Sequence, residues 1–200
     1  MSEQPQKTRG SLAKDIITLP NLISTAGYAL VQSGCQEITT PQGVAKIIAG
    51  RGFDIGDGLA ARLTGQESDT GAAVDAGLDK LGMLRIITAS WREDATPRPI
   101  LATIAASNII NGAASIIAKA RHPETSYRTP LSGKLSMAFG NAALFLHLSA
   151  TAAERSPTMD HHAGWLRALG YVAFGASLPF ATDAAHHYIQ RARQSAPPQP

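Results

Sequence analysis

Long uncharged stretches alternate with short charged ones along this chain, and the pattern predicts helices that cross a membrane. A membrane helix needs about 20 mostly apolar residues, and three uncharged stretches come close to or exceed that length, residues 16–36, 99–118 and 135–153. Two further segments, residues 41–64 and 71–91, have a helical apolar pattern that carboxylates and basic residues interrupt. If these two segments cross a membrane, their charges must face a cavity inside the protein.

The basic residues between these segments support six spans, the sixth being the uncharged stretch 168–182 and its polar continuation. With the N-terminus inside, the segments expected to be cytoplasmic contain ten Lys and Arg residues, and the opposite loops contain four. This asymmetry follows the positive-inside rule. Apolar alternation never persists, so no strands are expected, and the Ala-rich stretches favour helix. A soluble helical bundle with basic turns is the alternative that the pattern leaves open.

We therefore predict an all-α fold, an integral membrane bundle of six transmembrane helices formed by residues 15–194. Residues 1–14 are expected to form a polar cytoplasmic segment. The Pro-rich tail, residues 195–200, is expected to be disordered. The protein is then a multi-pass protein of the cell (inner) membrane.

Composition changes this picture less than it first suggests. The chain is 44% hydrophobic with a mean hydropathy of −0.04, values that by themselves suit a soluble protein. Small residues dominate the apolar fraction, however, with 34 Ala and 18 Gly besides, and such residues score below Leu or Ile while they allow close helix packing. Gly52-x3-Gly56 is one candidate packing element. The composition argues against disorder, a disulfide scaffold and collagen. The basic residues are spread over loops with few aromatics, which argues against nucleic-acid binding.

Four aspartates are spaced so that two consecutive helices would bring them together. Asp54 and Asp57 are three residues apart and Asp75 and Asp79 are four apart, so each pair shares one helix face. Four carboxylates in one pocket repel one another, and a divalent cation removes that conflict. Ligation by oxygen alone suits Mg²⁺, Mn²⁺ or Ca²⁺ rather than zinc.

The residues between the aspartates suit a pyrophosphate. Gly58 and Ala61 leave room for a flat ligand to approach the helix backbone. Arg62 can bind a phosphate through two hydrogen bonds. Gly71 opens the second helix, where free N–H groups favour an anion. Metal, arginine, small residues and a helix N-terminus together predict a site for a pyrophosphate.

The whole string resembles the complete signature of the CDP-alcohol phosphatidyltransferases, integral membrane enzymes of phospholipid synthesis. All eight fixed positions match, and they read Asp54-x2-Asp57-Gly58-x2-Ala61-Arg62-x8-Gly71-x3-Asp75-x3-Asp79. The resemblance implies transfer of the phosphatidyl group of CDP-diacylglycerol to an alcohol, with release of CMP, at a site facing the cytoplasm. It also implies a homodimer surrounded by membrane lipids.

The resemblance implies a role for each matched residue. The four aspartates would surround one or two divalent ions, Mg²⁺ or Mn²⁺, and Asp79 would also take the proton from the acceptor hydroxyl. The CDP part of the substrate would be held by the remaining four matched positions, Gly58, Ala61, Arg62 and Gly71.

Three shorter elements resemble the branch of the family that makes phosphatidylglycerophosphate from glycerol 3-phosphate. They are Lys80 after Asp79, Leu19-Pro20-Asn21-Leu22, and Gly133-Lys134-Leu135-Ser136. Ala76 stands where that branch usually has Pro, so inositol phosphate and phosphatidylglycerol stay open as acceptors. A non-catalytic membrane protein that binds a divalent metal is the alternative of another class.

An acceptor that carries a phosphate needs cations near the metal site. The candidates are Lys134, Arg128, Arg121, Lys119 and Lys80, and Arg51, just before the signature, is a further one. Adjacent histidines such as His161 and His162 point to different sides of a helix and make poor metal sites. His147 lies within an expected span and has no partner identifiable from the sequence.

Overall fold

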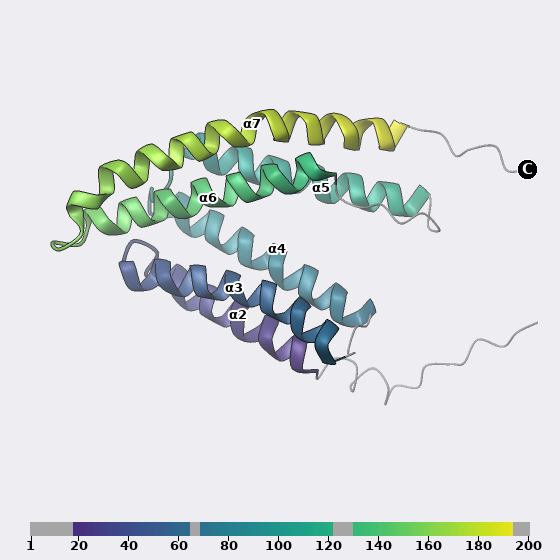
Figure 1. Cartoon of the computed structure of the whole chain (residues 1–200), viewed down its shortest axis with the longest axis horizontal. Helices are drawn as coiled ribbons and strands as arrows, with labels where there is room; N and C mark the ends of the chain where they lie inside the picture. Colours follow the sequence, from purple (N-terminus) through teal and green to yellow (C-terminus); the bar gives the residue numbers. More distant parts are fainter. Residues whose placement is uncertain (1–17, 65–68, 122–129, 194–200) are drawn as a thin grey trace, which may run out of the picture. The chain divides into compact units, whose positions relative to one another are not determined.

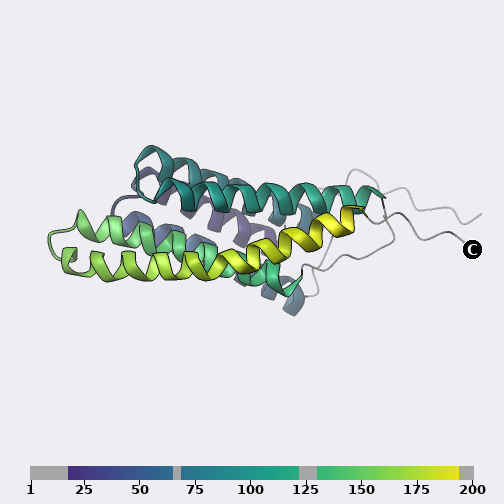
Figure 2. The ribbon, with the colours of Figure 1, turned by 90° about the horizontal axis from the view of Figure 1, so that it is seen from above.

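The computed structural model of the chain describes residues 18–64, 69–121 and 130–193. All regular structure in these ranges is helical, which confirms the all-α prediction (Figures 1 and 2). The expected N-terminal segment and Pro-rich tail lie outside the described residues. The helices are α2 (Leu19–Gln36), α3 (Pro41–Thr64), α4 (Asp69–Arg92), α5 (Arg98–Arg121), α6 (Leu131–Glu154), the short 3₁₀ helix η1 (Asp160–His162) and α7 (Ala163–Arg193).

Of the helices in the described part, α6 is the one whose length and hydropathy suffice to cross a membrane. All the expected helices are present in the structure. That six of them span a membrane stays a prediction. The other helices have a lower mean hydropathy for two reasons. Helices α3 and α4 carry charged residues within their length, and Ala and Gly contribute less hydropathy than Leu or Ile.

The chain forms two compact units, residues 1–89 and residues 90–200. The first contains α2, α3 and most of α4. The second contains the end of α4 together with α5, α6, η1 and α7. Each unit is built around one closely packed antiparallel pair, α2 with α3 and α6 with α7, whose members lie side by side in Figures 1 and 2.

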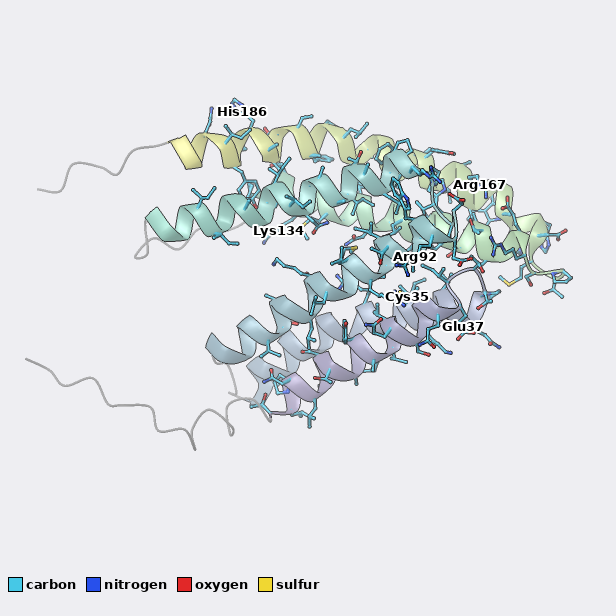
Figure 3. All side chains as sticks on the ribbon, turned by 180° about the vertical axis from the view of Figure 1, so that it is seen from behind. Cys35, Glu37, Arg92, Lys134, Arg167 and His186 are labelled. Carbon is cyan, nitrogen blue, oxygen red and sulfur yellow. The ribbon has the colours of Figure 1, made fainter. Side chains whose placement is uncertain are left out.

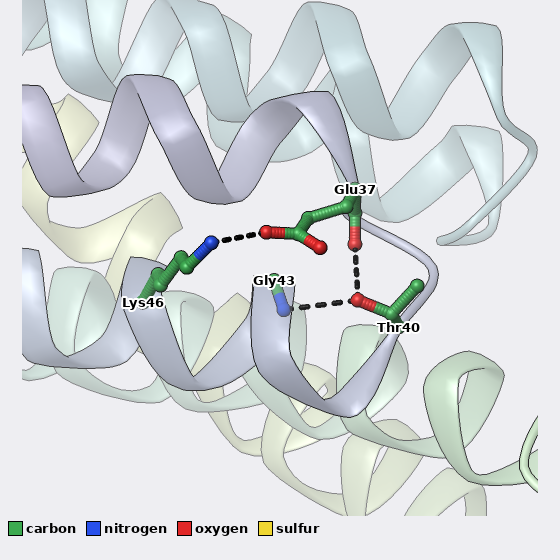
Figure 4. Close-up of polar contacts among 4 residues, drawn as sticks. All are labelled: Glu37, Thr40, Gly43 and Lys46. Carbon is green, nitrogen blue, oxygen red and sulfur yellow. Dashed lines mark hydrogen bonds and ion pairs between the residues drawn. The ribbon is translucent and has the colours of Figure 1, made fainter.

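The turn between α2 and α3 is held by one threonine and one ion pair (Figure 4). The Thr40 hydroxyl donates a hydrogen bond to the Glu37 carbonyl over 2.9 Å and accepts one from the Gly43 N–H over 3.0 Å. It thus satisfies an N–H of the first turn of α3, which has no partner within the helix. Lys46 donates to the Glu37 carboxylate and closes the same turn.

Glycines let the backbones of α2 and α3 touch at two levels. A Cβ added to Gly50 would lie 2.5 Å from the Gly27 carbonyl oxygen, and one added to Gly34 would lie 2.5 Å from the Gly43 carbonyl oxygen. No side chain larger than hydrogen fits at these four positions. Gly52, by contrast, faces open space among the described atoms, so the close contact with α2 lies on another face of α3 and Gly52-x3-Gly56 stays a prediction.

In the second unit, a buried histidine packs α6 against α7. His147 is 1% exposed, and its ring meets that of Tyr171 edge-on with the centroids 4.7 Å apart. The ring also fills the space beside Gly170, because a Cβ there would lie 2.8 Å from the imidazole. The residue that the sequence left without a partner is therefore part of a helix interface.

We expect Gly170→Ala to destabilise the protein, because the buried imidazole of His147 must move to admit the methyl group. The expected loss is about 1–3 kcal/mol, the usual cost of overpacking. Gly175→Ala is the matched control, since no described atom lies within 4 Å of its added Cβ. This control replaces glycine in the same helix and gains up to about 1 kcal/mol from helix propensity. Thermal unfolding in detergent measures both variants, and equal midpoints would contradict the proposed contact.

Candidate active site

The eight signature residues lie on two consecutive helices of the first unit. Five of them are on α3, and the other three, Gly71, Asp75 and Asp79, are on α4. Helix α3 ends at Thr64 and α4 begins at Asp69, so the expected helix–turn–helix arrangement of the signature is confirmed. Because only four residues separate them, these consecutive helices run antiparallel to each other.

Two of the four aspartates have described side chains, and both lie on one face of α4. Asp75 and Asp79 are one helical turn apart and half-buried. The Oδ1 atom of Asp75 is shielded from solvent. On α3, the side chains of Asp54, Asp57, Ala61 and Arg62 lie outside the described part, so their roles stay predictions.

Arg51 is ion-paired with Asp79. The Arg51 Nη1 atom lies 2.6 Å from the Asp79 Oδ1 atom, and the two side chains are 18% and 34% exposed. Arg51 precedes Asp54 by three residues, so the two positions share a face of α3. The ion pair therefore indicates that this face of α3 is turned toward the face of α4 that carries Asp75 and Asp79.

Sequence reasoning considered Arg51 only as a candidate cation for the acceptor. It missed the pairing with Asp79, although one signal was available. In an antiparallel helix pair, residues equally far from the connection lie level. Arg51 is 13 residues before the end of α3 at Thr64 and Asp79 is 10 residues after the start of α4 at Asp69, so the two lie within about one turn of each other.

The described residues agree in chemistry with a divalent metal site. No group of three or more His, Cys, Asp or Glu side chains able to hold a metal is present among them, and they include two of the four predicted ligands. Asp75 and Asp79 offer carboxylate oxygens, the donors that Mg²⁺ and Mn²⁺ prefer. The guanidinium of Arg51 lies against Asp79 and supplies positive charge there, as a metal ion would.

Most of the cations expected to bind an acceptor phosphate belong to the second unit, whereas Lys80 and Arg51 belong to the first. Lys134 lies in the first turn of α6 and is exposed (Figure 3). Arg121 is the last residue of α5 and its side chain is not among those described, while Arg128 lies outside the described residues. Lys80, next to Asp79 on α4, is exposed.

A polar contact that the sequence did not predict holds α4 against α2. Arg85 Nε donates a hydrogen bond to Gln32 Oε1 over 3.0 Å, and Gln32 Nε2 donates to the Tyr28 hydroxyl over 2.7 Å. Arg85 lies less than two turns beyond Asp79 on the same helix. The contact therefore fixes α4, and with it Asp75 and Asp79, to the α2–α3 pair.

The remaining polar candidates have ordinary structural roles. Cys35 is a buried free thiol (Figure 3). His186 contacts Gln190, and its neighbour His187 contacts Asp183, so the two rings of this pair have different partners. The rings of His161 and His162, however, lie with their centroids 3.8 Å apart on η1, so the expectation that adjacent histidines point to different sides is wrong for that pair.

Comparison with known proteins identifies the family. No curated protein and no solved structure matches the chain. The sequence model of the CDP-alcohol phosphatidyltransferases matches residues 17–177, which is most of the chain and includes all eight signature positions. Members of this family are embedded in membranes, generally use divalent metal ions, and transfer a substituted phosphate group from a CDP-alcohol to an alcohol. The chain therefore belongs to the CDP-alcohol phosphatidyltransferase family and is an enzyme of phospholipid biosynthesis.

Proposed function

We propose that this enzyme transfers the phosphatidyl group of CDP-diacylglycerol to glycerol 3-phosphate, giving phosphatidylglycerophosphate and CMP. It acts in the cell (inner) membrane with its site toward the cytoplasm, as a homodimer. The observation that carries the proposal is the complete aspartate signature divided between α3 and α4 of a chain that belongs to this family.

The four aspartates, Asp54, Asp57, Asp75 and Asp79, are proposed to hold Mg²⁺ or Mn²⁺. The bound ions supply positive charge that neutralises the pyrophosphate and stabilises the departing CMP. All four ligands are carboxylates, which suits these ions and also keeps the site anionic until they bind.

The other signature residues are proposed to hold the CDP part of the donor. The small residues Gly58 and Ala61 let the nucleotide approach α3, and Arg62 pairs with phosphate oxygens. Gly71 lies in the first turn of α4. There the free backbone N–H groups and the positive end of the helix dipole favour a phosphate.

Asp79 is proposed to act as the general base. One of its carboxylate oxygens accepts the proton of the acceptor hydroxyl while the acceptor oxygen bonds to the phosphorus that carries diacylglycerol. The bond between that phosphorus and the CMP oxygen breaks, and CMP leaves with the bonding electrons. A metal-binding protein without activity would not require a fourth carboxylate placed as a base, which favours catalysis over that alternative.

The choice of glycerol 3-phosphate rests on the three short elements that resemble the branch making phosphatidylglycerophosphate, and cations are the groups that its phosphate needs. Lys80 follows Asp79 directly, and Lys134, Arg128 and Arg121 are the proposed partners of the acceptor phosphate. A phosphate-bearing acceptor needs such groups because a desolvated phosphate without a cation is unfavourable. Inositol phosphate and phosphatidylglycerol also carry phosphate and are the alternatives that an assay must separate.

The test is CMP release by protein purified in detergent, with CDP-diacylglycerol, Mg²⁺ or Mn²⁺, and a panel of alcohols. We expect release that depends on glycerol 3-phosphate and stops when EDTA removes the metal. Release with inositol phosphate or phosphatidylglycerol instead would replace the acceptor and keep the chemistry. Absence of acceptor-dependent CMP from a protein that still binds Mn²⁺ would favour the non-catalytic alternative.

A further inference from the structure

We propose that Arg51 is the counter-ion of Asp79 in the metal-free enzyme and that it sets how tightly the aspartate site binds a divalent ion. The inference rests on the metal site proposed above and adds a residue that is not part of the signature. Arg51 and a divalent ion then compete for the Asp79 carboxylate, so the ion pair is more than a structural contact.

The geometry of the pair is that of a strong, partly desolvated contact. The charged atoms of Arg51 and Asp79 are 2.6 Å apart, and the guanidinium side chain is only 18% exposed. Arginine stays protonated in proteins, so its positive charge cannot be lost to relieve a conflict. A carboxylate that is half-buried beside other carboxylates is unfavourable without such a partner. Arg51 thus stabilises the Asp79 carboxylate when no metal ion is bound.

The register of the two helices determines where Arg51 acts. Asp54 follows Arg51 by one turn of α3, and Asp75 precedes Asp79 by one turn of α4. Because the two helices run in opposite directions, Arg51 lies at the end of the signature farther from the α3–α4 connection. Among the described side chains of the set, its guanidinium contacts Asp79, which is also the proposed base.

The Asp79 carboxylate cannot form its closest contacts with a guanidinium and a divalent ion at the same time. Like charges at ion-pair distance repel strongly in a partly buried site. Arg51 must therefore move away from Asp79, or loosen its contact, before the carboxylate can coordinate an ion. The free energy of the ion pair is subtracted from the free energy of metal binding, so a variant without the cation binds metal more tightly.

Lys46 provides a matched control on the same helix. It is a cation of α3 five residues before Arg51, and it is paired with Glu37 at the α2–α3 turn. Replacing Lys46 by Gln changes the net charge of the protein as much as Arg51→Gln does. A general electrostatic effect would appear in both variants, whereas competition at Asp79 appears only in Arg51→Gln.

The experiment measures Mn²⁺ binding to the detergent-purified full chain by electron paramagnetic resonance, without substrate. We expect Arg51→Gln to lower the dissociation constant about tenfold and Lys46→Gln to leave it unchanged. In EDTA, Arg51→Gln should also unfold at a lower temperature than the parent, and added Mn²⁺ should raise its midpoint by more. Activity is not needed for either measurement.

Unchanged or weaker Mn²⁺ binding by Arg51→Gln would overturn the inference while leaving the proposed function standing. If the parent protein itself binds no Mn²⁺, the proposed metal site is wrong and the inference falls with it. Should Arg51→Gln fail to fold even with Mn²⁺, Arg51→Lys gives the same test. Lysine keeps the charge but lacks the planar fork of donors, so this variant should bind Mn²⁺ more tightly than the parent by a smaller factor, and equal binding would refute the proposal.

Discussion

Replacing Asp79 by Asn is expected to lower the rate of CMP release about a thousandfold, the range expected for loss of a general base. The amide has nearly the shape of the carboxylate, so α4 should fold as before. It cannot accept the proton of the acceptor hydroxyl, and it is a weaker ligand for a divalent ion. It also removes the partner of Arg51, whose guanidinium lies 2.6 Å away. The initial rate at saturating CDP-diacylglycerol and acceptor is the quantity to measure.

Asp94→Asn is the control for loss of one carboxylate. Asp94 forms an exposed ion pair with Arg98, 3.2 Å apart and outside the signature. Exposed pairs of this kind contribute about 0–1 kcal/mol to stability, so activity and unfolding should both be nearly unchanged. An Asp79→Asn protein as active as the Asp94→Asn protein would show that the base is another residue.

Replacing Gly50 by Ala is expected to destabilise the first unit by about 3 kcal/mol, at the upper end of overpacking effects. The added Cβ would lie 2.5 Å from the Gly27 carbonyl oxygen and 2.9 Å from Val31 Cγ2. The first of these atoms belongs to the backbone of α2 and cannot move by a rotamer change. The helices must separate, and Asp54, one turn further along α3, must shift with them. We therefore expect CMP release to fall together with stability.

Gly52→Ala is the matched control for this variant. It lies two residues further along α3, and no described atom is within 4 Å of its added Cβ. Alanine there should be neutral or stabilising by up to about 1 kcal/mol through helix propensity. Unfolding midpoints in detergent compare the two proteins. If Gly50→Ala unfolds at the same temperature as Gly52→Ala, the backbone contact between α2 and α3 does not exist.

The positions of the helices could be predicted from the sequence because each depends on residues near one another in the chain. The stretch 41–64 coincides with α3, and 71–91 lies within α4, which begins two residues earlier and ends one residue later. Apolar periodicity and the placement of Pro41 at the start of α3 contain that information. The helical placement of the signature follows from the same local pattern.

The contacts between helices could not be predicted in this way. The pairing of Arg51 with Asp79, the contact of Gly27 with Gly50, and the contact of Arg85 with Gln32 each depend on which faces of two helices meet. Periodicity in one helix gives a face but not its partner. The same holds for Gly52-x3-Gly56, since a small-residue spacing marks a candidate face without showing what covers it.

The two glycine contacts also determine how far α3 can slide along α2. On each helix the two contacting glycines are seven residues apart, Gly27 and Gly34 on α2 and Gly43 and Gly50 on α3. A slide of one turn would bring larger side chains to both crossings at once, so only one alignment of the pair is sterically allowed. If α2 and α3 cross the membrane as predicted, the position of the uncharged helix α2 also sets the depth of the α3 aspartates in the bilayer. Substitutions of charged residues on α3 would then leave that depth unchanged.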